Sequence, residues 1–107
     1  SSKFITNFKI IGSSNYAFNL ILKKPNFNFA KRIEKTLLKE GIEFRKGSAG
    51  GGNQLRQPYL KNIIKTKEYL KFKNTEHVHF FGYYIGNYPT LNKSDILHLC
   101  KIINSVK

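Results

Sequence analysis

The spacing of apolar residues changes twice in the first half of the chain, from the period of a strand to that of a helix and back. Residues 15–22 alternate between two faces, and both faces are largely apolar. One face carries Tyr16, Phe18, Leu20 and Leu22, and the other carries Ala17, Asn19 and Ile21. This pattern predicts a buried or central β-strand. Residues 42–45 return to the strand period, with Ile42 and Phe44 expected to point inward.

Residues 26–41 carry the helical spacing between these two predicted strands. The apolar residues that recur there are Ala30, Ile33, Leu37 and the adjoining Leu38. Asn26 or Asn28 can cap the start of the helix, because a side-chain oxygen there can accept a hydrogen bond from the first turn. Gly41 can supply the left-handed residue that closes it. The first 45 residues therefore predict the order strand, helix, strand.

The middle of the chain is less regular. Residues 47–60 are rich in glycine and polar side chains, and residues 61–73 show no period that assigns a structure. Residues 75–82 predict a short helix, with Thr75 as its cap and Gly82 at its end.

The last third predicts a strand at residues 83–86, a turn at residues 87–89 and a final helix at residues 92–107. Asn92 and Asp95 resemble a capping box at the start of that helix. Its apolar stripe consists of Ile96, Leu99, Cys100, Ile103 and Val106. The whole order predicts an α+β fold, a short and mostly antiparallel sheet with helices on one face.

The composition suits one domain with a modest core. The chain has 107 residues, of which 40% are hydrophobic, and this argues against global disorder. No apolar run approaches the roughly 20 residues of a membrane span, and no secretory signal pattern is present. The single cysteine, Cys100, fits a reducing compartment, so we expect a cytoplasmic protein. Methionine is absent even from position 1, so the chain is either processed or a fragment of a longer protein, and we expect the fragment.

The formal net charge of +13 invites a nucleic-acid interpretation, because basic surfaces attract phosphate backbones. Only Arg32, Arg45 and Arg56 among the 19 basic residues are arginines, however, and bidentate recognition of bases and phosphates relies on arginine. The lysines are spread over the whole length of the chain. A basic nucleic-acid-binding module is therefore our alternative from another functional class, not our first expectation. Anionic small molecules remain open as ligands.

Residues with catalytic or metal-binding chemistry are few and scattered. His77 and His79 are two residues apart, so on a helix they point to different faces and do not chelate one metal ion. We expect no metal site. Cys100 lies on an apolar stripe and predicts an inert core thiol. Glu76 is either a general acid or base or, more simply, a dipole partner in the first turn of a helix. We expect no catalytic residue in this chain.

The string GSAGGGNQLRQPYL, residues 47–60, has two interpretations. Its glycine and serine content favours a flexible tether. The polar residues after the glycines favour a loop that faces a ligand, since three glycines let the backbone approach without side chains in the way. It is not a phosphate-binding Walker loop, because the Gly-Lys-Ser/Thr ending is missing. We prefer the ligand-facing loop.

Two strings, GIEFRKGSAGGGNQLRQPYL and GYYIGNYP, together with the terminal helix, resemble the C-terminal small domain of sugar-nucleotide PLP enzymes. This is the DegT/DnrJ/StrS aminotransferase family, which has the fold-type-I, aspartate-aminotransferase-like fold. The resemblance runs from about Asn15 to the C-terminus. The glycine-Asn-x-x-Arg-Gln-Pro string is similar to the dehydratase branch, the 4-keto-6-deoxyhexose 3-dehydratases. The His-Tyr-x-x-Pro-x-His string usual in the aminotransferase branch does not follow Arg45.

This resemblance implies that residues 1–14 lead in from a missing large domain and that residues 15–107 form the small domain. It implies that the large domain holds PLP or PMP and the catalytic Lys or His, and that the full-length protein is a homodimer. The implied function is closure over a nucleotide-linked 4-keto-6-deoxy sugar, in deoxysugar and lipopolysaccharide biosynthesis. A sugar-nucleotide aminotransferase of the same family is the alternative.

The resemblance also implies which groups face the substrate. Carried over position by position, they are Arg45, Gly51, Gly52, Asn53, Arg56, Gln57, Tyr84 and Asn87. Backbone amides in the glycine loop, with two arginines nearby, would favour the oxygens of a sugar nucleotide. The extra glycine in residues 50–52 and the lead-in at residues 46–48 depart from the usual family pattern.

Overall fold

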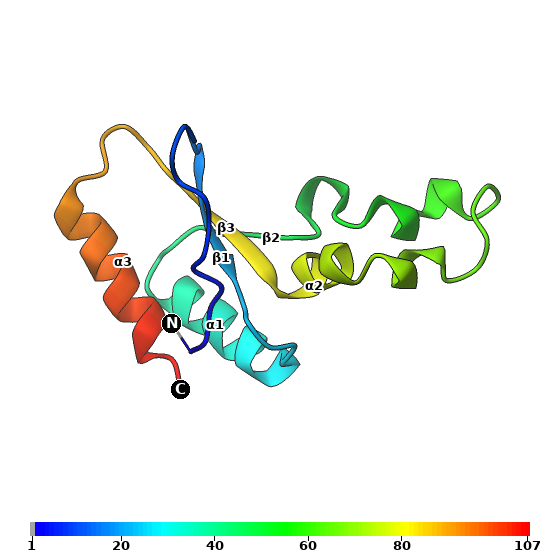
Figure 1. The fold of residues 1–107 in the computed structure, drawn as a ribbon. Coiled ribbons are helices and arrows are strands. Elements are labelled where there is room, and N and C mark those ends of the chain that lie inside the picture. The colour runs from blue at the N-terminus through cyan, green and yellow to red at the C-terminus, as the bar shows by residue number, and fades with distance from the viewer. Residues whose placement is uncertain (1) are drawn as a thin grey trace.

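A computed structural model describes residues 2–107 and shows an α+β fold (Figure 1). Its sheet has three antiparallel strands, β1 (Ala17–Ile21), β2 (Arg45–Lys46) and β3 (Gly82–Gly86), in the spatial order β1-β3-β2. The predicted strand at residues 83–86 is confirmed, and it is the central strand of the sheet. The fold class expected from the sequence is confirmed.

The strand predicted at residues 15–22 exists as β1, but it lies at an edge of the sheet. Of the two predicted alternatives, a buried or a central strand, the central one is therefore wrong, whereas Ala17, Leu20 and Leu22 are buried. The N-terminal segment lies along its outer side: Ile5 N–H donates to the Ile21 carbonyl at 2.9 Å, and Lys23 N–H donates to the Lys3 carbonyl at 2.8 Å. These bonds satisfy backbone groups that a bare edge would leave to water, so β1 can carry apolar residues on both faces.

The second predicted strand, residues 42–45, is shorter than expected and displaced toward the C-terminus. Only Arg45 and Lys46 pair with β3, opposite Tyr84 and Tyr83 respectively. Ile42 and Phe44 do pack against the core as expected, and both are partly buried. Their side chains anchor the connection from the preceding helix to the sheet.

Helix α1 (Phe27–Lys39) follows the predicted pattern closely. Asn26 caps it by accepting a hydrogen bond from Phe29 N–H at 2.9 Å, and Gly41 adopts a left-handed φ of 66° just after it. Three of the four predicted apolar positions, Ala30, Ile33 and Leu37, are buried. The fourth, Leu38, is 69% exposed, because it lies one residue round the helix from the buried stripe.

Helix α3 (Lys93–Ser105) starts with the capping box that the sequence predicts: the side chains of Asn92 and Asp95 each accept a hydrogen bond from the other's backbone N–H. Its predicted stripe is buried only toward the C-terminus. Ile103 and Val106 lie in the core, whereas Ile96 is 41% exposed. Cys100, expected to be a core thiol, is only partly buried. The buried Ile102 was not on the predicted stripe.

Helices α1 and α3 pack together and cover one face of the sheet, where the core lies (Figure 1). Leu20, Tyr83 and Ile85 project into it from the strands. The Tyr83 hydroxyl donates to Glu34 of α1 at 2.9 Å, and burial together with this carboxylate raises the pKa of Tyr83. We call this part, made of the sheet with α1 and α3, the body.

Residues 47–81 leave the end of β2, run outward and return into β3 (Figure 1). We call this segment the arm. It consists of four 3₁₀ turns, Ala49–Gly51, Gln54–Arg56, Pro58–Leu60 and Glu68–Lys71, followed by α2 (Lys73–Phe81). The arm lengthens the molecule to 49 Å in its longest dimension, against 33 and 24 Å in the others. None of the described helices is long and apolar enough to cross a lipid bilayer.

The short helix predicted at residues 75–82 is α2, but it begins two residues earlier than expected. Thr75 lies inside the helix, and its predicted role as the cap is wrong. Gly82 follows the last helical residue as predicted. Gly82 is also packed tightly, since an added Cβ would lie 2.6 Å from the Val78 carbonyl oxygen.

Candidate functional site

The structure divides the predicted substrate-facing residues into two groups. Arg45, Tyr84 and Asn87 belong to the sheet and the turn after it. Gly51, Gly52, Asn53, Arg56 and Gln57 lie in the arm. The two groups are linked where β2 runs directly into the arm, and there Gly47 N–H donates to the Gly82 carbonyl at 2.6 Å.

Arg45 and Tyr84 lie on the face of the sheet opposite the helices, which we call the open face. They are cross-strand partners, so their side chains share this face. The Tyr16 ring meets the Tyr84 ring edge-on, with centroids 6.2 Å apart. A small pocket of about 210 Å³ lies here, lined in part by Tyr16, Arg45, Tyr84 and Tyr88. Gly86 lets the Tyr88 ring lie on the strand, since an added Cβ would come within 2.6 Å of that ring.

The Arg45 guanidinium remains accessible. Its side chain is 64% exposed, and its nearest acidic partner, Glu43, lies 4.0 Å away. An accessible guanidinium beside aromatic rings can bind an anionic or carbonyl oxygen while the rings contact the apolar face of a sugar or a base. The open face therefore has suitable chemistry for a sugar nucleotide.

Asn87 is engaged within the protein. Its side-chain Nδ2 donates to the Asn15 carbonyl at 2.8 Å, and its backbone N–H donates to the Tyr16 carbonyl at 2.9 Å. These bonds join the end of β3 to the start of β1 and so hold Tyr16 beside Tyr84.

In the arm, Arg56 is held by Glu76 of α2. Its Nε and Nη2 donate to the two carboxylate oxygens at 2.7 and 2.6 Å. The guanidinium carbon also lies 3.9 Å from the centroid of the Tyr69 ring and 4.8 Å from that of Phe80. A fork-shaped ion pair between aromatic rings fixes the side chain in one orientation. Arg56 thus connects three parts of the arm that are distant in sequence.

Asn53 is 2% exposed and is fully hydrogen-bonded. Its Nδ2 donates to Glu76 Oε1 at 2.7 Å, and its Oδ1 accepts a hydrogen bond from Leu55 N–H at 3.3 Å. Its backbone N–H donates to Nδ1 of His79 at 3.0 Å, so this ring nitrogen must be unprotonated. Asn53 therefore fastens the glycine loop to α2.

The glycine loop itself is packed against α2. Gly52 has a left-handed φ of 56°, and an added Cβ would lie 2.3 Å from Nδ1 of His79 and 2.8 Å from Cα of Ser48. The Gly51 carbonyl accepts a hydrogen bond from Nε2 of Gln57 at 2.7 Å. The glycines allow this close approach of backbone to helix. The loop belongs to a folded arm and is held at both ends.

The electrostatics of the arm follow from these contacts. Hydrogen bonds from Arg56 lower the pKa of Glu76, and the bond to Glu76 raises the pKa of Arg56, so both groups stay charged. Burial, and then the positive charge of Arg56, lower the pKa of His79. At neutral pH the arm therefore holds an ion pair beside a neutral imidazole.

The sequence analysis missed the roles of four arm residues: Glu76 and His79, and the Tyr69 and Phe80 rings beside Arg56. Glu76 lies in the first turn of α2, as one interpretation expected, but it also binds Arg56 and Asn53. Glu76 and His79 are three residues apart, so they lie on the same side of a helix. This spacing is the feature of the sequence that could have indicated that they act together. His77 points elsewhere: its Nε2 lies 2.5 Å from the Leu22 carbonyl. Among residues 2–107, no three His, Cys, Asp or Glu side chains gather as a metal site would require.

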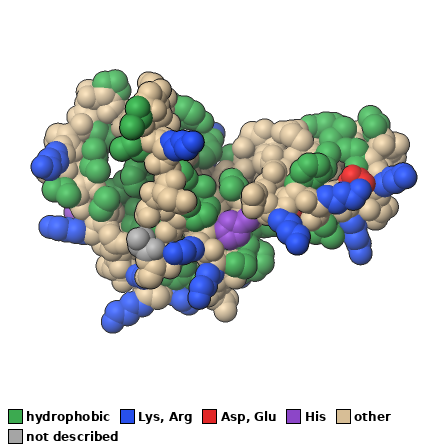
Figure 2. Space-filling model, viewed as in Figure 1, with side chains coloured by type: hydrophobic (Ala, Val, Ile, Leu, Met, Phe, Trp, Pro, Cys, Tyr) green, Lys and Arg blue, Asp and Glu red, His purple; other side chains and the backbone are tan. Residues whose placement is uncertain are grey.

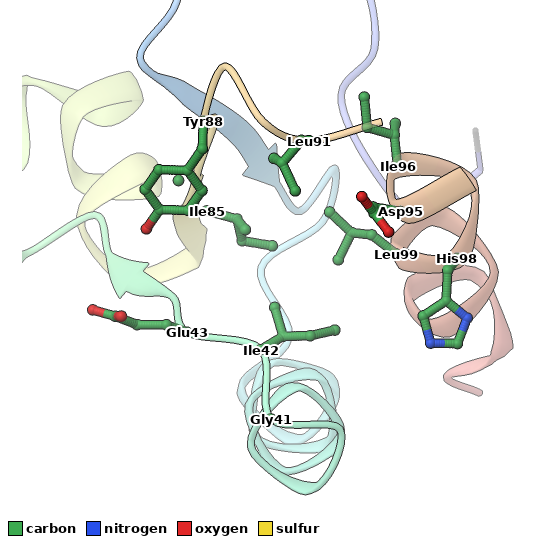
Figure 3. Close-up of a pocket in the computed structure, with 11 residues that line it drawn as sticks. Gly41, Ile42, Glu43, Ile85, Tyr88, Leu91, Asp95, Ile96, His98 and Leu99 are labelled. Atoms are coloured by element: carbon green, nitrogen blue, oxygen red, sulfur yellow. The ribbon is translucent and has the colours of Figure 1, made fainter. Parts of the chain in front are cut away.

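A further hollow of about 410 Å³ lies between α3, the end of β3 and residues 41–43 (Figure 3). Its walls include the apolar side chains of Ile42, Leu91 and Leu99. Asp95 also lines it, but its carboxylate already accepts the Asn92 N–H of the capping box at 3.0 Å. None of the predicted substrate-facing residues lines this hollow.

Comparison of the chain with known protein families, with curated proteins and with solved structures gives no match.

Proposed function

We propose that this chain is the small domain of a PLP- or PMP-dependent enzyme, a 3-dehydratase acting on a nucleotide-linked 4-keto-6-deoxyhexose in cytoplasmic deoxysugar synthesis. The observation that carries the proposal is the open face, where an accessible Arg45 and the Tyr84 ring line one pocket on the strand β2 that continues into the glycine arm. The motif resemblance assigns that arm and Arg45 to the substrate side of the domain. The domain would close over the sugar nucleotide with its open face.

The two groups of residues have different parts in this proposal. Arg45 and Tyr84 contact the ligand directly, with the charge of Arg45 directed at an oxygen and the ring of Tyr84 at an apolar sugar or base face. Gly51 and Gly52 shape the loop, because the Gly51 N–H donates to the Ser48 carbonyl, the Gly51 carbonyl accepts from Gln57, and Gly52 packs against His79. Arg56, Asn53 and Gln57 act as positioning residues, because their polar groups are engaged in holding the loop.

The lysines of this chain do not fit a Schiff base with the cofactor. Such a lysine must lose its proton easily, which requires burial or a neighbouring cation. Every described lysine except Lys3 is exposed, and Nζ of Lys3 donates to the carbonyls of Asn104 and Val106. The proposal therefore gives the cofactor and the catalytic group to another domain, and it assigns no chemical step to these residues.

The test uses the complete enzyme that carries this domain. Arg45→Ala should lower kcat/KM for the keto-sugar nucleotide by roughly tenfold to a hundredfold, the usual consequence of losing a charge-assisted hydrogen bond. Arg45→Lys should recover part of the loss. The matched control is Lys39→Ala, which removes an exposed charge on α1. Equal activity of the Arg45 and Lys39 variants would contradict the proposal.

The same assay separates positioning from contact. Arg56→Ala should lower both the melting temperature and kcat/KM, because the loop loses its brace. If Arg56→Ala lowers kcat/KM with no change in melting temperature, Arg56 contacts the substrate and our division of roles is wrong.

The product identifies the branch of the family: a deoxygenated keto sugar supports the dehydratase, and an amino sugar supports the aminotransferase.

A further inference from the structure

A second pocket lies at the outer end of the arm, away from the open face. Its volume is about 460 Å³, and the turns from Leu55 to Tyr69 line it. Lys61, Lys65 and Lys67 belong to its wall. In Figure 2, Lys and Arg side chains gather around this end of the arm. The pocket touches the candidate site only through Arg56 and Gln57.

The charges of these three lysines are not paired with acidic side chains in the described part of the chain. No acidic side chain lines the pocket, and none of its three lysines forms an ion pair within residues 2–107. The nearest acid in sequence, Glu68, is paired with Lys71 at 2.5 Å, and Glu76 is paired with Arg56. Like charges around one hollow repel one another, and a bound anion would relieve this repulsion.

The backbone at this pocket carries a further signal. Lys67 is the one non-glycine residue among those described with a positive φ, at 67°. This conformation costs a residue with a Cβ about 1–2 kcal/mol, and glycine or asparagine would be the unstrained choice. A lysine at a strained position in the wall of a basic pocket favours a role for its side chain.

The remaining wall narrows the class of ligand. Leu60, Ile64 and Tyr69 give the pocket an apolar side. Its volume falls in the range of small-molecule sites, about 300–1,000 Å³. A concave site whose wall holds three lysines and an aromatic ring suits a compact, multiply charged anion attached to a less polar group.

We propose that this outer pocket binds the diphosphate group of a small molecule such as a nucleoside diphosphate, through Lys61, Lys65 and Lys67. Ammonium groups bind phosphate oxygens by charge-assisted hydrogen bonds, and a diphosphate offers enough oxygens for all three. This site goes beyond the proposed function, since any molecule with a diphosphate group would qualify whatever reaction the parent enzyme performs.

The experiment is a calorimetric titration of the chain with pyrophosphate, at about 0.05 M salt and again at physiological salt near 0.15 M. Two triple variants are compared. The pocket variant combines Lys61→Gln, Lys65→Gln and Lys67→Gln and so removes the pocket charges. The α1 variant combines Lys31→Gln, Lys35→Gln and Lys39→Gln and removes an equal charge from the exposed side of α1. The pocket variant should bind pyrophosphate at least about tenfold more weakly, and the α1 variant should stay within about twofold of the unaltered chain. Equal weakening in both variants would overturn the site.

Further titrations with inorganic phosphate, a nucleoside diphosphate and single-stranded RNA identify the source of the anion. The nucleoside diphosphate should bind at least as tightly as pyrophosphate and more tightly than phosphate. RNA should be weakened about equally by both triple variants, as expected for diffuse charge. If RNA binds more tightly than the nucleoside diphosphate and only the pocket variant loses it, the small-molecule assignment is wrong. Circular dichroism checks the fold of each variant. If the triple pocket variant is misfolded, the single variant Lys61→Gln takes its place, and it should also bind pyrophosphate more weakly than the unaltered chain.

Discussion

The body and the arm are stabilised in different ways. In the body, Leu22, Ile33 and Leu37 are at most 1% exposed and pack with the other core residues. In the arm, residues 47–81, all of them described, the buried side chains are Asn53 and Phe81, and Phe81 joins the core where α2 runs into β3. The arm is held by hydrogen bonds, the two ion pairs Arg56–Glu76 and Lys71–Glu68, and close glycine contacts, which specify a shape while burying little apolar surface.

This difference has consequences for dynamics. Burial of apolar surface is the largest favourable term in folding, so a segment without it opens at a lower free energy than the core. We therefore expect the arm to open separately from the body. A segment that can open while the body stays folded suits a part of the domain that must admit and release a ligand.

The largest effect is expected in the body. Leu37→Ala should reduce the free energy of unfolding by about 2–5 kcal/mol, because it leaves a cavity in the core. The adjacent Leu38→Ala should change it by no more than about 0.5 kcal/mol, because that side chain is 69% exposed. Urea unfolding followed by circular dichroism measures both. Equal losses would mean that α1 is not packed as described.

A smaller and local effect is expected at the glycine loop. Gly52→Ala adds a Cβ that would meet His79 at 2.3 Å, whereas an added Cβ at Gly50 would meet nothing within 4 Å. Both positions have positive φ, so each variant pays about 1–2 kcal/mol of backbone strain. Gly52→Ala should cost visibly more than Gly50→Ala and should increase amide exchange in the arm. If the two variants behave alike, the loop does not pack on α2.

The Arg56–Glu76 ion pair should contribute less to the stability of the arm than the packing of the glycine loop does. Glu76→Gln should destabilise the arm by about 1–2 kcal/mol, since the partly exposed pair is screened by solvent. The expected result is faster hydrogen exchange at arm amides with unchanged exchange in α1 and α3. Glu68→Gln, which removes the more exposed pair with Lys71, is the control and should cost about 0–1 kcal/mol. Loss of protection throughout the body would show that arm and body unfold together.

The smallest effect is the response to pH. The pKa of His79 is lowered in the folded arm, so its contribution is fully present above its ordinary pKa of about 6.5 and is lost as the pH falls through the lower folded value. Glu76 acts in the same direction in more acid solution, because its pKa is also lowered. Arm amides should therefore lose protection as the pH falls from neutral to below about 6.5, the ordinary pKa of histidine, after correction for intrinsic exchange. His79→Gln should reduce that dependence, and an unchanged dependence would exclude His79 as its source.

The same difference between the regions decided how much the sequence could predict. Helices α1 and α3 were predicted with their caps, because a helix is specified by residues three or four apart. The edge position of β1 could not be predicted, because it depends on pairing between Phe18 and Ile85, far apart in the chain. Residues 61–73 fold through short turns that leave no period in the sequence.

The candidate site shows the same limit. Motif resemblance indicated Arg45, Arg56 and Tyr84, but only the structure separates the accessible Arg45 from the braced Arg56. Glu76, the partner of Arg56, is 20 residues further along the chain. His79, the partner of the Asn53 backbone N–H, is 26 residues further along. Polar contacts of this range follow no repeat, so single-sequence patterns do not reveal them.

The most direct test of the account is a nuclear magnetic resonance titration of the isotope-labelled chain with a nucleotide-linked 4-keto-6-deoxy sugar. The account predicts that amide shifts concentrate at Arg45, Tyr84 and residues 50–53, and that Arg45→Ala removes them while the spectrum of α1 and α3 stays unchanged. Shifts confined to α1 and α3, or no shifts at the open face at saturating ligand, would contradict the claim that this face covers the sugar nucleotide.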